Sequence, residues 1–159
     1  MLIDVTSFTS GPRQIENAVE TQKTANQVAV AERINGYIDF YQSEFLRRAV
    51  GKQWCTLIDE YSKADHDEPD ESMESLIEML KEPFADYVFF YMLRDMNVQP
   101  TITGLVQLKC ANSYVSPLEK GVQTWNRMVD GLRLFASEVA VEGVTIDRDM
   151  VKYINSFNL

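Results

Sequence analysis

The stretch that decides the fold reads PFADYVFFYMLRDMN (83–97), then QPTITGLVQLKCANSYVSP (99–117) and LEKGVQTWNRMVDGLRLF (118–135). Its first part is apolar nearly all round when drawn as a helix, which is typical of a helix surrounded by others. Its last part repeats apolar residues at steps of three and four, which suits packing along a neighbouring helix. The sequence therefore predicts two long packed helices that hold out the middle part as a contact surface.

The middle part, residues 98–116, predicts a β-hairpin-like insert. It lacks a helical period and is rich in Thr, Ile, Val and Tyr, and Gly104 is a turn signal within it. Ser116, Pro117 and Glu119 then form a capping box that opens the following helix. Two strands alone are only marginally stable in water. The insert must therefore lean on its own bundle or on another chain, and the sequence leaves both open.

Upstream, residues 1–22 predict an N-terminal arm with a short strand at Leu2 to Val5. From about Thr24, an amphipathic helix is predicted, which Gly36 can bend or break and which ends near Val50. Phe40 and Leu46 fall off its apolar stripe, which indicates that protein covers more than one face. The stripe itself consists of Val28, Ala31, Ile34, Ile38, Tyr41, Phe45 and Ala49.

Four further elements are predicted around the central stretch. A short helix contains Trp54 and Tyr61, and an acidic run at 65–71 is a solvated loop. The next helix ends before Pro83, because proline is tolerated in the first turn of a new helix. Residues 144–159 predict a last amphipathic segment with a short helix capped at Thr145 or Asp147. The fold class is all-α: one bundle (23–143) of about five to six helices with the insert between two long ones.

Composition narrows the function classes. The 159 residues carry 24 acidic and 15 basic side chains, a net charge of −9, with no gathered basic face beyond Arg47, Arg48 and Lys52. Such a chain repels nucleic-acid phosphates. Two cysteines without ligand spacing predict neither a disulfide scaffold nor a metal site. No apolar run approaches the ~18 residues that span a bilayer, so no membrane partner is expected.

Chemistry-bearing motifs are not found in the sequence. Its glycines are isolated, so a phosphate-binding loop is absent, and His66 is the one histidine. A calcium loop counted from Asp65 fails because Pro69 stands at a ligand position. Carboxylate pairs such as Glu82 with Asp86 are predicted to lie on solvated helix faces. We therefore expect no enzyme activity, no metal and no cofactor.

Two blocks resemble the small helical head-to-tail connector (adaptor) proteins of tailed phages, particularly those of crAss-like phages. They are NGYIDFYQSEFLRRAVGKQWCTLIDEY (35–61) and YVFFYMLRDMNVQPTITGLVQLKCANSYVSPLEKGVQTWNRMVD (87–130). The family pattern has a helix stop, an aromatic helix, a polar insert with a Thr-Gly-Val-like core, a Ser-Pro cap and a Trp-Asn-x-Met helix. Here Val50 stands before Gly51 where leucine is usual, and about two thirds of the chain takes part.

The resemblance implies a structural protein of the virion neck. Identical subunits would form a ring, a dodecamer, that joins the portal to the tail and surrounds an axial channel for DNA. A second ring or tail proteins would be further partners. The acidic balance would let DNA pass without sequence-specific binding. The protein would assemble in the host cytoplasm and reside in the neck of the virion.

Two sets of contact residues follow. The interface with neighbouring subunits or tail components would use Thr101, Thr103, Leu105, Val106, Leu108 and Tyr114 of the insert. The resemblance also implies portal docking by a C-terminal segment, which here would use Ile146, Met150, Val151, Tyr153, Ile154 and Phe157. The alternative function is a soluble helical adaptor or regulatory protein that binds one cellular partner through the same insert.

Overall fold

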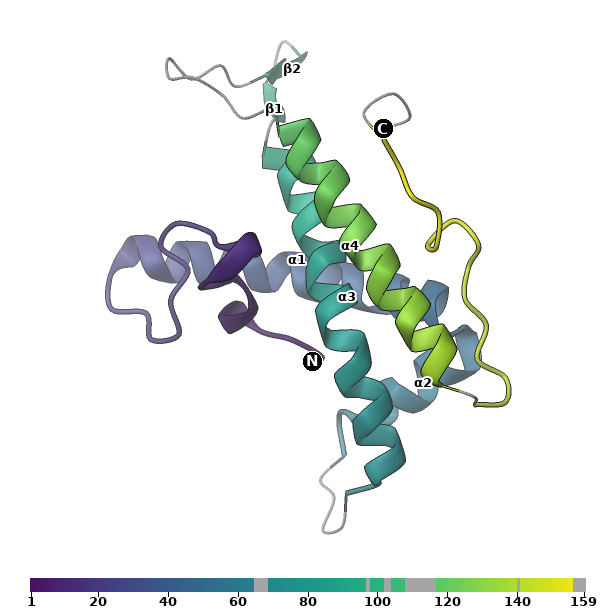
Figure 1. Ribbon diagram of the computed structural model, residues 1–159. Coiled ribbons are helices and arrows are strands. Elements are labelled where there is room, and N and C mark those ends of the chain that lie inside the picture. Colours follow the sequence, from purple (N-terminus) through teal and green to yellow (C-terminus); the bar gives the residue numbers. More distant parts are fainter. Residues whose placement is uncertain (65–68, 97, 102–103, 108–116, 140, 156–159) are drawn as a thin grey trace.

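The computed structural model describes the backbone of residues 1–64, 69–96, 98–101, 104–107, 117–139 and 141–155. Within these ranges the fold is helical, with four α-helices and one two-stranded ladder (Figure 1). The all-α class is confirmed, whereas the predicted count of about five to six helices is wrong. In chain order the elements are η1 (Val5–Phe8), η2 (Gly11–Arg13), α1 (Ala25–Ala49), α2 (Lys52–Tyr61), α3 (Glu71–Met96), β1 (Val98–Thr101), β2 (Gly104–Gln107) and α4 (Pro117–Glu138).

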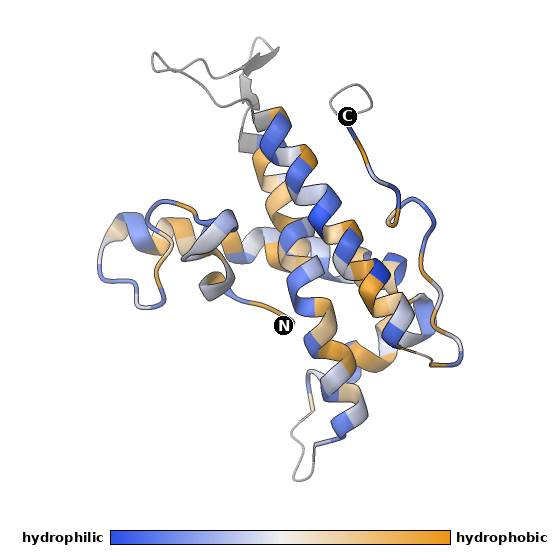
Figure 2. Ribbon diagram, viewed as in Figure 1, coloured by the Kyte–Doolittle hydropathy of each residue, from blue (hydrophilic) through white to orange (hydrophobic). Residues whose placement is uncertain are grey.

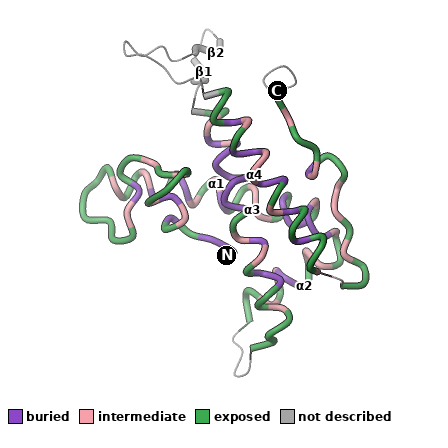
Figure 3. Tube along the Cα trace, viewed as in Figure 1, coloured by how far each residue is buried: buried purple, intermediate pink, exposed green. Residues whose placement is uncertain are grey.

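The centre of the molecule is the pair α3 and α4, which run side by side while α1 crosses them (Figure 1). Figure 3 places the buried residues where these helices meet, and along α4 hydrophilic and hydrophobic residues alternate (Figure 2). Trp125 of α4 packs against Phe90 and Tyr87 of α3, with ring centroids 4.9 and 6.3 Å apart. The prediction that the aromatic helix is central is confirmed, because Phe84, Tyr87, Val88, Phe89, Phe90 and Met92 are all buried.

Pro83 lies inside α3 and does not open a new helix, so this boundary was predicted wrongly. An interior proline removes a backbone hydrogen bond and costs about 3 kcal/mol. The neighbouring helix accommodates it: a Cβ on Gly131 of α4 would lie only 2.8 Å from Pro83 Cγ. The absence of a side chain at Gly131 therefore lets α4 approach the proline ring, and burial of Leu80 and Phe84 on either side offsets the cost.

Helix α1 follows its sequence pattern closely. Thr24 and Gln27 form a capping box at its start, and the helix ends at Ala49. Gly36 lies within it and causes no break. Gly51, which follows, has a φ of 87°, a conformation that glycine adopts without steric cost.

The N-terminal arm is part of the core. Leu2 and Ile3 are buried and lead into η1, so the strand predicted at Leu2 to Val5 is wrong. Asp4 caps η1 by accepting a hydrogen bond from the backbone N–H of Thr6. Phe8 is completely buried, with its ring 6.5 Å from that of Phe89. The arm is thus fixed to α3 by its apolar side chains.

Residues 141–155, which we call the C-terminal strap, run along α4 in a non-helical conformation (Figure 1). The short amphipathic helix predicted here is therefore wrong over these residues. Met150 is fully buried and fixes the strap to the core. In the described part of the chain, no helix is both long and apolar enough to cross a membrane.

Candidate functional site

Of the insert residues predicted to form an interface, Thr101, Leu105 and Val106 lie in the β1–β2 ladder, which begins beyond the end of α3 (Figure 1). The two strands pair antiparallel, with Thr101 opposite Gly104 and Pro100 opposite Leu105. Val106 lies opposite Gln99 in the same ladder. Of the other predicted contacts, Thr103, Leu108 and Tyr114 lie outside the described residues. A hairpin that spans all of 98–116 therefore stays a prediction.

The residues predicted to dock on the portal lie along the strap, where most of them face the chain's own core. Met150 is buried, and Ile146, Val151 and Ile154 are partly buried against the core. Tyr153 is about half exposed, and Phe157 lies outside the described residues. Among the described members of this set, Tyr153 is thus the one most accessible to another protein.

Side chains of α4 form hydrogen bonds with the main chain of the strap. The side-chain amide of Asn126 donates to the Ile154 carbonyl at 3.0 Å and accepts from the Ile154 N–H at 2.9 Å. Trp125 Nε1 donates to the carbonyl of Lys152 at 2.9 Å. The asparagine amide therefore replaces a neighbouring β-strand, since it pairs with both backbone groups of one residue. This pairing could not be predicted from the sequence, because an asparagine in a helix is usually interpreted as a solvated polar residue.

The strap is also tied to the C-terminal end of α1. The backbone N–H groups of Thr145 and Asp147 donate to the carbonyls of Val50 and Arg48, and Arg48 Nε pairs with the Asp147 carboxylate at 2.9 Å. The N–H of Asp149 and then Arg48 lower the pKa of Asp147 below its usual value. A lowered carboxyl pKa favours the folded state above the group's ordinary pKa, and this contribution is lost as the pH falls through the lowered value.

We predict that Asn126→Ala detaches the end of the strap without unfolding the bundle. The loss of two hydrogen bonds to Ile154 should cost about 1–2 kcal/mol. Hydrogen exchange of the Ile154 amide should accelerate while amides in the middle of α3 stay protected. Asn126→Asp is the matched control, since it can accept from Ile154 but cannot donate. Unchanged exchange at Ile154 in Asn126→Ala would contradict the pairing.

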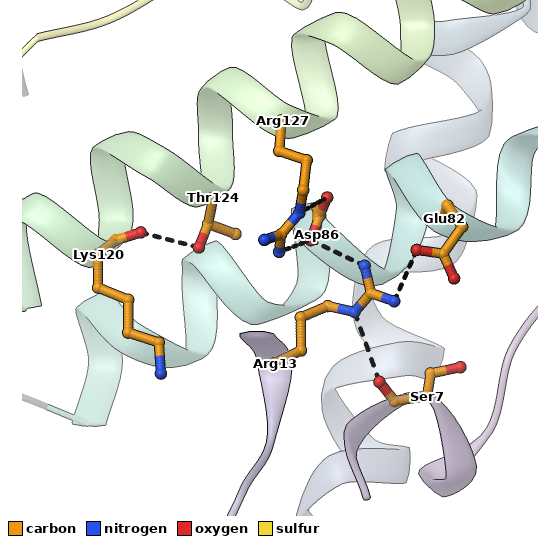
Figure 4. A network of polar contacts seen from close by, with 7 residues as sticks. All are labelled: Ser7, Arg13, Glu82, Asp86, Lys120, Thr124 and Arg127. Carbon is orange, nitrogen blue, oxygen red and sulfur yellow. Dashed lines mark hydrogen bonds and ion pairs between the residues drawn. The ribbon is translucent and has the colours of Figure 1, made fainter. Parts of the chain in front are cut away.

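A buried ion-pair network joins the N-terminal arm to α3 and α4 (Figure 4). Asp86, 2% exposed, accepts from Arg13 Nη1 at 3.0 Å and from Arg127 Nε at 2.7 Å. Arg13 also pairs with Glu82 at 2.7 Å and donates to the carbonyl of Ser7. The network thus connects three segments through one carboxylate.

The predicted solvated position of Asp86 is therefore wrong. The carboxylate lies between two guanidinium groups, and the hydrogen bond with Asp86 raises the pKa of Arg127 above its usual value. Charge-assisted bonds of this kind offset the cost of removing a carboxylate from water. Local sequence could not reveal the partners, because Arg13 and Arg127 lie 73 and 41 positions away. The hydrogen bonds of Arg13 and Arg127 in this network all go to protein oxygens, which favours a structural role.

An aromatic cluster lies where α1 crosses the end of α3. Tyr41 stacks on Tyr91 with centroids 4.4 Å apart, and Phe40 meets Tyr41 edge to face at 4.9 Å. Phe40 is 73% exposed, whereas Leu46 is buried, so only one of the two off-stripe residues of α1 is covered by this chain. Burial and then the charge of Asp95 raise the pKa of Tyr41 to about 12.

Among the described residues, no three side chains of the His, Cys, Asp and Glu types gather as metal ligands. His66 lies outside the described residues. Cys55 is a free, partly buried thiol whose pKa is raised by burial. A raised pKa disfavours the reactive thiolate form.

Comparisons of the chain with protein-family models, with curated proteins and with solved structures found no match.

Proposed function

We propose that this chain is a structural subunit of the neck of a tailed phage, an adaptor ring that joins the portal to the tail. Identical copies form the ring, a dodecamer, and the axial channel passes DNA. The proposal rests on the resemblance at residues 35–61 and 87–130 and on the architecture that these residues adopt. The subunit assembles in the host cytoplasm and resides in the virion neck.

The observation that carries the proposal is the position of the β1–β2 ladder at the end of a long helix pair. Strand β1 follows α3 in the chain, and the β1–β2 ladder lies at the opposite end of the α3–α4 pair from α2 (Figure 1). Two strands are marginally stable without support. A neighbouring subunit or a tail component supplies that support in the ring, using Thr101, Leu105 and Val106.

The charge of the chain agrees with a channel. A net charge of −9 on each copy gives a ring a negative field that keeps DNA from adhering to its wall. The portal contact uses the outward side of the strap around Tyr153, while Met150 holds the strap on its own subunit. Of the docking residues predicted from sequence, those that remain accessible therefore form the proposed portal contact.

The direct test is assembly with the portal protein of the proposed phage. Analytical ultracentrifugation and negative-stain imaging of the mixture should reveal a ring seated on the portal. A folded monomer that never joins that portal, at any ratio tested, would overturn the proposal. An encoding genome without portal or tail genes would favour the alternative, an adaptor that binds one cellular partner.

A second prediction concerns the insert. Replacing residues 103–108 with a Gly/Ser linker should abolish ring assembly and leave the helical circular dichroism signal nearly unchanged. The physical reason is that the buried side chains described on α3 and α4 already pack against one another. In the control, a Gly/Ser linker of equal length is inserted between Glu20 and Lys23, which lie in an exposed connection before α1. A collapse of the melting temperature in the insert variant would place the insert in the subunit's own core instead.

A further inference from the structure

Phe40 presents a large aromatic ring to solvent on α1, and the helix leaves room beside it. Gly36 stands one turn earlier, and a Cβ built there would meet no atom within 4 Å. These two residues, together with Tyr37, Tyr41 and Asp95, line an open cleft of about 430 Å³ that Arg33 also borders. The described residues that line the cleft belong to α1 and to the end of α3.

The rings in this cleft are fixed at defined angles. Phe40 stands at 83° to Tyr41, and Tyr37 lies nearly parallel to Tyr41 at 20° with centroids 6.2 Å apart. Tyr91 stacks beneath Tyr41 and fixes its orientation. Aromatic faces carry negative charge density, and the ring of Phe40, which is 73% exposed, is accessible to a cation from solvent. This arrangement suits a flat cation.

One carboxylate, Asp95, and one guanidinium, Arg33, stand among the residues that line the cleft. Asp95 accepts a hydrogen bond from the Tyr37 hydroxyl at 3.0 Å, which fixes the carboxylate at the rim. The charges of Asp95 and Glu44 contribute to the raised pKa of Tyr41, as expected for a negative potential at that ring. Arg33 is a cation at the same rim, yet among the ion pairs between described residues none joins Arg33 to Asp95. The carboxylate thus retains capacity for a second cation.

We propose that this cleft binds an arginine side chain of a basic partner polypeptide, with the guanidinium over the exposed ring of Phe40 and paired with Asp95. Arginine suits the site better than lysine because its guanidinium is planar, weakly hydrated and able to form two parallel hydrogen bonds to a carboxylate. The same chain already places Arg133 over the ring of Tyr153 at 4.2 Å. The partner is a basic polypeptide, because a chain of net charge −9 attracts cationic chains.

The test uses the full chain and does not depend on the ring proposed above. The probe is the peptide acetyl-Gly-Arg-Gly-amide, and its control carries citrulline, which has nearly the same shape without the charge. Two-dimensional NMR should show saturable shifts at the backbone amides of Gly36, Phe40 and Asp95 with the arginine peptide, weakened by salt. Equal binding of the citrulline peptide, or no saturable shift, would overturn the proposal.

Four variants sharpen the test. Phe40→Ala and Asp95→Asn should each weaken binding of the arginine peptide about three- to fivefold, since each removes one exposed cation contact. Arg33→Ala should strengthen it, because a like charge leaves the rim. Leu134→Ala, an exposed apolar position on α4, should change nothing. Because all four side chains are exposed, folding should be preserved, which circular dichroism verifies.

Sedimentation equilibrium distinguishes the two sources of the arginine. The wild-type chain and Phe40→Ala should sediment alike in the absence of a partner. If Phe40→Ala instead dissolves an oligomer that the wild-type chain forms, another copy occupies the cleft and the proposed basic partner is wrong. The ring proposal fails on different grounds, namely the absence of assembly with the portal.

Discussion

Phe8→Ala is expected to lower the free energy of unfolding by about 3–5 kcal/mol, the range for removing a fully buried phenylalanine ring. Phe8 is completely buried and packs against Phe89 of α3, although it belongs to an arm that the sequence alone describes as polar and weakly periodic. The loss combines the lost transfer of the ring from water with the cavity left beside α3. Urea unfolding followed by circular dichroism measures it.

Phe40→Ala is the matched control for this experiment. The same side chain is removed, but Phe40 is 73% exposed, so the free energy of unfolding should change by no more than about 0.5 kcal/mol. A difference of several kcal/mol between the two variants would establish that the arm belongs to the core. Equal effects would mean that η1 does not pack on α3 in solution.

Asp86→Ala should cost about 3 kcal/mol, because it leaves two guanidinium groups without their shared carboxylate. The side chain of Arg13 is only 11% exposed and suffers most. The value stays at the lower end of the range for broken buried pairs, since the side chain of Arg127 is 38% exposed and regains water. Unfolding in urea again provides the measurement.

Glu78→Ala provides the comparison on the same helix. Glu78 pairs with Lys81 at the surface of α3, and exposed pairs of this kind contribute about 0.3–0.5 kcal/mol. Both substitutions remove one carboxylate from α3 and place alanine there, so helix propensity differs little between them. If Asp86→Ala is no more costly than Glu78→Ala, the network in Figure 4 contributes nothing to stability.

The helices with periodic apolar residues were predictable from the sequence, and so was which of them lies at the centre of the molecule. The stripe of α1, the stop before Gly51 and the central position of the aromatic helix all depend on local patterns of apolar residues. The helix boundary at Pro83 was predicted wrongly because the rule against interior prolines considers only local sequence. Gly131, which accommodates the proline ring, lies on another helix. Information of that kind is absent from any window of the sequence.

The strap and the ion-pair network were missed for a related reason. Met150, Val151 and Ile154 have helical spacing, yet the main chain of the strap pairs with side chains of α4 instead of with itself. Asp86 looked like a solvated residue because its partners come from distant segments. One signal of the candidate cleft was present in the sequence, since Phe40 fell off the buried stripe, but its aromatic and acidic neighbours became clear only from the crossing of α1 with α3.

The ion pair between Arg13 and Asp86 also constrains the order in which the chain folds. The two residues are 73 positions apart, and Arg127 joins the same carboxylate only 41 positions later. During synthesis the arm therefore leaves the ribosome long before its anchor exists, with Leu2, Ile3 and Phe8 uncovered in the meantime. Contacts between such distant residues form slowly because a long loop must close first. Docking of the arm should thus be a late event in folding, and the period before it is when nascent chains are most exposed to aggregation.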